Sequence, residues 1–190
     1  MSDHDDVGVH TFPLERADAL EDPSRYRFCS REELLADLDP DPDATVADLG
    51  SGTGFYARDV SPFVRAVYAV DVQGGMHALF RERGVPENVE FVTASVGSLP
   101  VADDSLDGAF STMTHHEYAD PSSFAELARA LRPGARLVTV DWSADGRGDD
   151  GPPLEDRFGS DEAAAQLEDS GFDIVTVRDR PETFVVVAVR

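Results

Sequence analysis

The segment from Val46 to Phe55, Val-Ala-Asp-Leu-Gly-Ser-Gly-Thr-Gly-Phe, places a short apolar stretch directly before a glycine-rich turn. A buried strand that is followed by such a turn and then by a helix is typical of nucleotide-binding sites. Glycine adopts positive φ, and the first N–H groups of a helix are free to bind a ligand. The spacing differs from the dinucleotide fingerprint Gly-x-Gly-x-x-Gly, whose third glycine would fall at Phe55. The turn therefore predicts a ligand site that is not the usual pyrophosphate site.

Beyond this turn, apolar strand patterns alternate with helical patterns. Strands are expected at residues 45–50, 66–71, 89–93, 107–112 and 135–141, and helices at residues 54–61, 74–83, 121–131 and 161–170. Continuously apolar strands that alternate with helices predict a parallel sheet covered on both faces, with right-handed crossovers. Two further strands, at 172–177 and 184–189, leave no room for a helix between them. They pair antiparallel or belong to different parts of the structure.

Length and local patterns predict the domain organisation. A chain of 190 residues is long enough for one domain with its own core. Residues 1–29 are acidic and weakly patterned, and we expect an N-terminal arm that becomes ordered near Tyr26. Ser30 and Glu33 form a capping box, which predicts a short helix after the arm. Residues 30–190 are expected to form the single domain.

Asp71 ends the second expected strand, about twenty residues after the glycine turn, where a carboxylate can accept both hydroxyls of a ribose. Further motifs follow in order: Ser98-Leu99-Pro100, Ser-Leu-Asp-Gly-Ala-Phe-Ser at 105–111, His115-His116, and Leu-Arg-Pro-Gly-Ala-Arg-Leu at 131–137. Together they cover residues 45 to 141 and resemble the class I S-adenosylmethionine-dependent methyltransferases. Within that family they are most similar to the quinone and small-metabolite methylases.

The resemblance implies an α/β fold of three layers, a Rossmann-like methyltransferase fold. Its seven-stranded, mostly parallel sheet would end in a C-terminal antiparallel hairpin. The resemblance also implies S-adenosyl-L-methionine as cofactor, S-adenosyl-L-homocysteine as product and a small-molecule substrate. The methyl acceptor, its reacting atom and the oligomeric state stay open.

In open α/β sheets the ligand lies beyond the carboxyl ends of the strands, so residues at strand ends are the candidates for cofactor binding. The resemblance implies that Asp48, together with the glycines of the turn, binds the methionine portion of the cofactor. It also implies that Asp71 binds the ribose and that Val72 contacts the adenine. At the third strand end an acid is common in the family, but this chain has Ser95, a weaker neutral acceptor. The expected cofactor-binding residues are Asp48, Gly50, Ser51, Gly52, Gly54, Asp71, Val72, Ser95, Val96 and Ser111.

The segment His115-His116-Glu117 follows the fourth strand, where the methyl group would be delivered. Alignment and exclusion of water are the protein's main contributions to methyl transfer, and a base helps only an acceptor that must lose a proton. We expect His116 as that base, with Glu117 orienting either His116 or a cationic substrate; the alternative is that one of the two histidines is a packing residue. Tyr26, His115 and Trp142 are expected to contact substrate, and Asp141 to line the acceptor pocket. No metal site is expected, because three consecutive residues cannot easily converge on one ion.

Charge is the other extreme feature, with 38 acidic residues against 16 basic ones, all arginine, and a net charge of −22. Such a surface repels nucleic acid, anionic lipid and its own copies unless concentrated salt screens it. We therefore expect no nucleic-acid or membrane partner and a halophilic, haloarchaeal origin. The one cysteine, Cys29, and the lack of a signal peptide or long apolar run favour a cytoplasmic location.

Two other functions remain open from the sequence. A nicotinamide-dependent oxidoreductase shares the strand-helix-strand half but needs the displaced third glycine and more sheet. A non-catalytic cofactor-binding or partner-binding domain is compatible with Ser95 and with the lack of an obligatory base.

Overall fold

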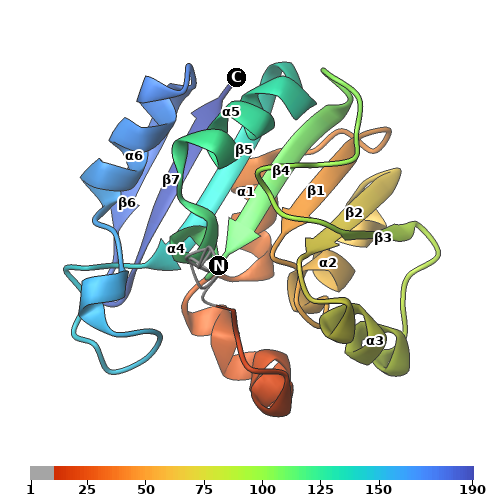
Figure 1. Ribbon diagram of the computed structural model, residues 1–190, viewed down its shortest axis with the longest axis horizontal. Coiled ribbons are helices and arrows are strands. Elements are labelled where there is room, and N and C mark those ends of the chain that lie inside the picture. Colours follow the sequence, from red (N-terminus) through yellow and green to blue (C-terminus); the bar gives the residue numbers. More distant parts are fainter. Residues whose placement is uncertain (1–10) are drawn as a thin grey trace, which may run out of the picture.

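The computed structural model describes residues 11–190, so the part of the expected arm at residues 1–10 lies outside the described residues. The centre of the fold is a seven-stranded sheet in the order β3-β2-β1-β4-β5-β7-β6 (Figure 1). The strands are β1 (Thr45–Leu49), β2 (Ala66–Asp71), β3 (Val89–Thr93), β4 (Leu106–Thr112), β5 (Leu131–Trp142), β6 (Asp173–Asp179) and β7 (Thr183–Val189).

Strand pairing confirms the mostly parallel sheet and its hairpin. β1 pairs in parallel with β2 and β4, while β3 and β5 extend the parallel part on either side. β7 runs antiparallel to both of its neighbours, β5 and β6. β5 begins before residue 135, where the sequence placed it, because Leu131 pairs with Leu106 across a register irregularity in β4.

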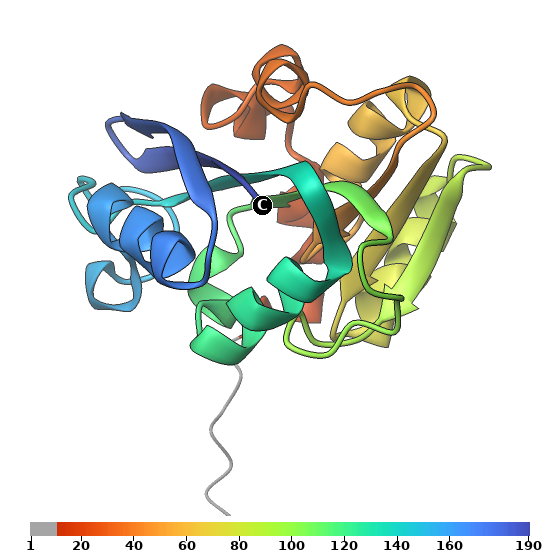
Figure 2. The ribbon, with the colours of Figure 1, turned by 90° about the horizontal axis from the view of Figure 1, so that it is seen from above.

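Helices cover both faces of the sheet (Figure 2). They are α1 (Arg31–Leu38), α2 (Phe55–Val60), α3 (Gly74–Arg83), α4 (His115–Tyr118), α5 (Pro121–Ala130) and α6 (Ser160–Asp169). The first three share a core cluster with Val67 and Val138, and α5 and α6 share the opposite cluster with Leu137 and Phe184. Because both faces are buried, the central strands are apolar without alternation.

The arm is ordered earlier than Tyr26. Two 3-10 helices, η1 (Leu14–Glu21) and η2 (Pro23–Arg27), precede α1. Ion pairs attach them to the domain, from Asp18 to Arg83 at 2.5 Å and from Glu21 to Arg58 at 2.5 Å. These partners lie far along the chain, so local patterns did not indicate them.

Local signals set the other helix boundaries. The Ser30 hydroxyl accepts the N–H of Glu33 at 3.2 Å, and α1 begins at the next residue, as the capping box predicts. Three short helical turns were not expected: α4, η3 (Ser61–Phe63) and η4 (Leu154–Asp156). Within residues 11–190, no helix combines the length and apolar character needed to cross a bilayer.

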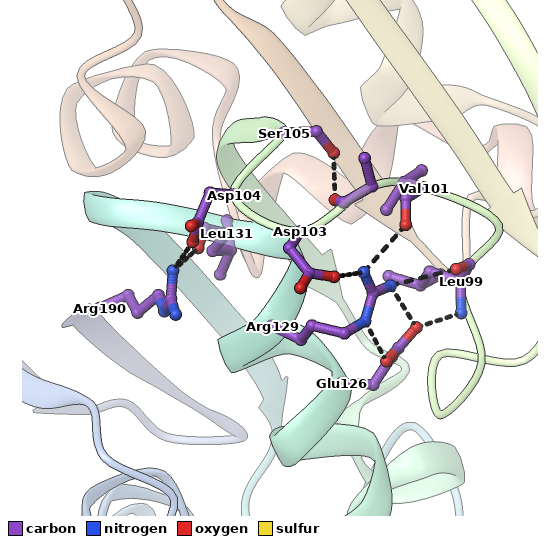
Figure 3. Close-up of polar contacts among 10 residues, drawn as sticks. Leu99, Val101, Asp103, Asp104, Ser105, Glu126, Arg129, Leu131 and Arg190 are labelled. Carbon is purple, nitrogen blue, oxygen red and sulfur yellow. Dashed lines mark hydrogen bonds and ion pairs between the residues drawn. The ribbon is translucent and has the colours of Figure 1, made fainter.

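Arg129 of α5 fixes the loop between β3 and β4, which contains the Ser98-Leu99-Pro100 motif (Figure 3). Its guanidinium pairs with Asp103 at 2.6 Å and with Glu126 at 2.7 Å. It also donates to the carbonyl oxygens of Val101 and Leu99, at 3.0 and 3.3 Å. This motif is therefore held by a structural ion-pair cluster.

Candidate active site

A cavity of about 1060 Å³ opens at the carboxyl ends of β1, β2, β4 and β5. The arm crosses this edge of the sheet (Figure 1) and contributes residues from Thr11 to Phe28 to the wall. Strand-end residues Asp48, Asp71 and Trp142 form other parts of the same wall. The parallel strands end at one edge, so they bring together residues that are far apart in sequence.

The glycine turn joins β1 to α2 with φ of 74° at Gly50 and 82° at Gly54. A Cβ at Gly50 would overlap the side chain of Thr114, and one at Gly54 would overlap the ring of Phe80. Both positions therefore require glycine for conformation and for space. Gly50 and Gly52 lie in the cavity wall, and so does Ser51, whose buried hydroxyl has no hydrogen-bond partner within residues 11–190.

The carboxylate of Asp71 is held by the turns on either side of it. One oxygen accepts the N–H of Gly52 at 2.9 Å, and the other accepts the N–H of Gln73 at 2.8 Å. Burial raises the pKa of Asp71, while the two backbone hydrogen bonds oppose that shift. The side chain is thereby fixed in the cavity wall, with oxygen lone pairs left to accept hydrogen bonds from a ligand.

Asp48 and Arg25 lie near each other deep in the cavity. Asp48 is 2% exposed, and its carboxyl group accepts a hydrogen bond from the backbone N–H of Ala57. Burial raises its pKa to about 8, and the charge of Arg25 only partly offsets this. The Arg25 guanidinium donates to the Leu20 carbonyl at 2.8 Å and to the Met113 sulfur at 3.8 Å. Among residues 11–190 it has no carboxylate within ion-pair distance, so both charged groups have unused capacity to bind a ligand.

The β2 and β3 ends form a slot between these strands and the arm. Val72, Ser95 and Val96 line it, and Val72 is 44% exposed. The Ser95 hydroxyl accepts the N–H of Gly97 at 3.2 Å. On the arm side, Phe12 closes the slot and accepts a hydrogen bond from the Gln73 side chain at 3.0 Å.

His116 and Asp141 form a dyad at the ends of β4 and β5. His116 Nδ1 lies 2.9 Å from one oxygen of Asp141, and the His116 N–H donates to the same oxygen at 2.7 Å. Asp141 is fully buried. Burial alone lowers the pKa of His116, but the hydrogen bond and charge of Asp141 outweigh it and raise the pKa. When Nδ1 carries the hydrogen and donates it to Asp141, Nε2 is left free to accept a proton.

Glu117 lies beside the dyad in the same wall. Its carboxylate has no hydrogen-bond or ion-pair partner within the part of the chain that the structure describes. Burial raises the pKa of Glu117 to about 7; His116 opposes this shift, and Asp71 and Asp141 add to it. Asp141, rather than Glu117 as the sequence suggested, is therefore the residue that orients His116.

Aromatic side chains close the wall beyond the dyad. The rings of Trp142 and Phe28 meet edge to face, with centroids 4.7 Å apart. Phe158 also lines the cavity. We call the part of the cavity bounded by Phe28, His116, Glu117, Trp142 and Phe158 the aromatic end. It lies next to the slot that Asp71 borders, so one cavity joins that slot to a chamber lined by both aromatic and ionisable side chains.

Comparison with known proteins decides the family. A model described as "Methyltransferase domain" matches residues 47–139. A solved S-adenosylmethionine-dependent methyltransferase from Aquifex aeolicus is 32% identical with a TM-score of 0.85, and the match covers 94% of this chain and 98% of that one. The chain belongs to the S-adenosylmethionine-dependent methyltransferases.

Curated relatives of this methyltransferase differ in what they act on. A demethylmenaquinone methyltransferase from Corynebacterium kroppenstedtii is 33% identical over 56% of this chain and 45% of that protein. An arsenite methyltransferase from Halobacterium salinarum is 31% identical over 75% of this chain and 40% of that protein. The chain thus spans less than half the length of either relative.

The cavity of the methyltransferase fits the family's cofactor, S-adenosylmethionine. Asp48 and Arg25 offer a carboxylate and a guanidinium with unused capacity to an amino-acid group that carries both charges. Asp71 offers carboxylate oxygens where hydroxyls can donate, and the slot lined by Val72 and Val96 has apolar sides for a planar base. Arg25 was missed in the sequence, since nothing in the weakly patterned arm indicated that it turns back over β1.

Asp141, expected to line the acceptor pocket, is fully buried behind the cavity wall, and four other expected site residues also lie outside that wall. Gly54 packs against Phe80, and Ser111 is fully buried within β4. His115 is 0% exposed, lies among aromatic rings such as Phe124, and has Nε2 3.2 Å from the Gln166 side chain. It is thus the packing member of the histidine pair.

Tyr26 is the fourth. Its hydroxyl donates to Asp59 at 2.8 Å, and its ring packs on Phe55 with centroids 4.9 Å apart. Its neighbours Arg25 and Arg27 line the cavity instead. The substrate contacts expected of Tyr26 and His115 are therefore corrected to structural ones. The remaining expected residues of the methyltransferase site lie in one wall.

Proposed function

We propose that this chain transfers a methyl group from S-adenosylmethionine to a small molecule held in the aromatic end. The observation that carries the proposal is the continuity of the cavity. Asp71 and the His116 side chain, which Asp141 holds from behind, line one cavity, as a donor and an acceptor that react in line require. The bound cofactor supplies an electrophilic methyl group on a sulfonium.

The cofactor residues would act as follows. Arg25 binds the α-carboxylate and Asp48 the α-ammonium of the methionine portion. Asp71 accepts hydrogen bonds from the ribose hydroxyls. Val72 and Val96 contact the adenine, and the hydroxyl of Ser95 accepts one hydrogen bond at most, because it is a neutral group already engaged by Gly97. The backbone of Gly50, Ser51 and Gly52 forms the floor.

His116 would act as general base. Asp141 holds its Nδ1, so Nε2 accepts the proton that the acceptor loses during methyl transfer. Asp141 is a positioning residue in this scheme. Trp142 and Phe28 exclude water and pack against the body of the acceptor.

Calorimetric titration with S-adenosylmethionine and separately with NADH tests the proposal. We expect binding of the first and none of the second. Tight binding of NADH alone would favour an oxidoreductase, and binding of neither would favour a partner-binding module. Transfer of a labelled methyl group to a panel of small acceptors, run in parallel, tests turnover directly.

The organisation and setting of the protein extend the proposal. We infer an arm at residues 1–29 attached to one domain at 30–190, in the cytoplasm of a salt-rich cell, with no nucleic-acid or membrane partner. The net charge of −22, without a single lysine, supports this. Thermal melts at 0.1 M and 2 M KCl test it, and we expect a clearly higher melting temperature at 2 M. Equal values would contradict the halophilic setting.

A further inference from the structure

The aromatic end of the cavity carries uncompensated negative charge. Two arginines border it, each lies over one of its rings, and each also has acceptors of its own: the Arg27 guanidinium lies 4.5 Å from the Phe28 centroid, and that of Arg157 5.6 Å from the Trp142 centroid. Arg27 pairs with Asp150 at 2.7 Å. Arg157 donates to the carbonyl oxygens of Pro152 at 2.9 Å and Ser143 at 3.3 Å, and its guanidinium lies 3.8 Å from Glu182.

Apart from Asp150, the acidic groups that line this end have no such partners. Glu155, Asp156 and Glu162 line the cavity, and none of them forms an ion pair within residues 11–190. Glu117 is the inner member of the group, next to His116. Anionic acceptors would therefore be repelled from this end, whereas a cation would be attracted.

Glu117 lies next to His116 in the cavity wall and has no hydrogen-bond or ion-pair partner within residues 11–190. Its side chain is half-buried, and a carboxylate that loses part of its hydration is stabilised by a hydrogen-bond donor or a cation. No side chain within residues 11–190 donates a hydrogen bond to Glu117 or forms an ion pair with it. The adjacent His116 is engaged by Asp141. A ligand with a charged donor group would complete the site.

The neighbouring aromatic rings provide a surface on which the body of such a ligand can pack. The edge-to-face pair of Trp142 and Phe28 presents aromatic surface to the cavity. A guanidinium of the chain already lies over each ring, so the rings serve the ligand as packing surface for an apolar body. A small molecule with an apolar body and an ammonium group matches this combination of a carboxylate and aromatic rings.

We propose that the methyl acceptor is a small amine whose ammonium group is bound by Glu117, an inference that rests on the proposed function. His116 Nε2 removes one proton from the ammonium group. The nitrogen lone pair then forms the new N–C bond to the methyl carbon, while the C–S bond breaks and its electron pair stays on sulfur. The products are a methylated ammonium, the neutral thioether S-adenosylhomocysteine and a protonated His116.

Three probes with the same aromatic body and different head groups test this inference: 2-phenylethylamine, 4-ethylphenol and phenylacetate. Each is titrated calorimetrically into the protein saturated with S-adenosylhomocysteine, and each is assayed for methyl transfer. We expect 2-phenylethylamine to bind at least about tenfold more tightly than the others, because bonds to a charged partner are the stronger ones. Equal or tighter binding of 4-ethylphenol or phenylacetate would overturn the inference.

The variant Glu117→Gln keeps the shape of the side chain and removes its charge. We expect it to weaken binding of 2-phenylethylamine about tenfold and to change binding of 4-ethylphenol less than twofold. Glu168→Gln, an exposed charge change on α6 outside the cavity wall, is the matched control. Equal weakening of all probes by Glu117→Gln would show a structural role only.

These outcomes separate the inference from the proposed function. A protein that binds S-adenosylhomocysteine and shows no preference for the amine keeps its assignment to methyl transfer and loses the amine acceptor. A protein that does not bind S-adenosylhomocysteine loses both. The comparison of the three probes on the unaltered protein stands even if a variant fails to fold, which thermal melts detect.

Discussion

The two ends of the cavity are held in different ways. At the slot, Asp71 is fixed by the N–H groups of Gly52 and Gln73, which belong to the same strand-helix-strand unit. At the aromatic end, His116 depends on Asp141 from the neighbouring strand, and Trp142 packs on Phe28 from the arm. The Asp71 carboxylate is thus held within one continuous segment, whereas the aromatic end requires three separate segments to meet.

This difference separates binding from chemistry. Changes at the slot should alter affinity for the cofactor, and changes at the aromatic end should alter turnover or affinity for the acceptor. Arg25 is the exception, because it belongs to the arm and still borders Asp48. The predictions that follow test how separate the two ends are.

The largest effect is expected for His116→Asn, which removes the base. The turnover number with 2-phenylethylamine should fall by about 100-fold or more, since a positioned base contributes 10²- to 10⁴-fold. The dissociation constant of S-adenosylmethionine should change less than twofold. Steady-state kinetics and calorimetry give the two numbers, and a parallel loss of cofactor binding would show that the two ends are coupled.

The variant Asp141→Asn tests whether Asp141 positions His116 for catalysis in addition to any role in folding. The charge that raises the pKa of His116 is lost, so that pKa should fall. Because the base acts in its neutral form, the acidic limb of the kcat/KM profile should move to lower pH while kcat decreases. A lower kcat with an unmoved limb would contradict the role given to Asp141.

Asp71→Asn is expected to weaken binding of S-adenosylmethionine by about 30-fold, because charge-assisted hydrogen bonds to the ribose are replaced by weaker ones. Asparagine keeps one acceptor oxygen, so the turn is disturbed less than in an alanine variant. Calorimetric titration measures the change. Asp169→Asn, an exposed change at the end of α6, is the control for net charge. Unchanged affinity in Asp71→Asn would remove the ribose assignment.

Arg25→Met is expected to weaken binding of S-adenosylhomocysteine about tenfold through loss of the bond to its carboxylate. Binding of 5′-methylthioadenosine, which lacks that carboxylate, should stay within twofold. Arg31→Met, on the exposed start of α1, is the matched variant. Equal losses for both ligands would mean that Arg25 only shapes the arm.

The smallest effect is a gain in stability for Asp48→Asn. In the folded protein the pKa of Asp48 is raised to about 8 from an ordinary value of 3.8, so stability from this group is complete below pH 3.8 and falls as the pH rises toward 8. Asparagine does not ionise, so the variant does not lose this stability as the pH rises. The variant should therefore melt a few degrees higher at pH 8 and nearly unchanged at pH 4. A gain that is the same at both pH values would contradict a raised pKa.

Local patterns were enough for the parallel part of the sheet and for Asp71. The glycine turn and Asp71 lie in one short unit, where positive φ and strand ends follow from neighbouring residues. The residues between β6 and β7 are too few for a helix, which left an antiparallel pair or two separate strands, and the family resemblance supplied the hairpin. Relationships within a single segment are the ones that a sequence pattern records.

Other parts of the site depend on contacts between distant segments. His115 and His116 are adjacent and chemically alike, yet one packs among aromatic rings and the other faces Asp141. The difference comes from contacts with other segments: Asp141 of β5 holds His116, and Gln166 of α6 contacts His115. Arg25 required the path of the arm across the sheet edge, and that path is set by ion pairs to α2 and α3.

The position of β7 also bears on how the protein is made. β6 leaves the ribosome first, yet it touches the sheet only through β7, which is synthesised after it. β6 therefore cannot join the sheet until residues 183–189 have emerged and inserted beside β5. During translation the β1-to-β5 part can assemble early, while β6 must wait for the strand that follows it.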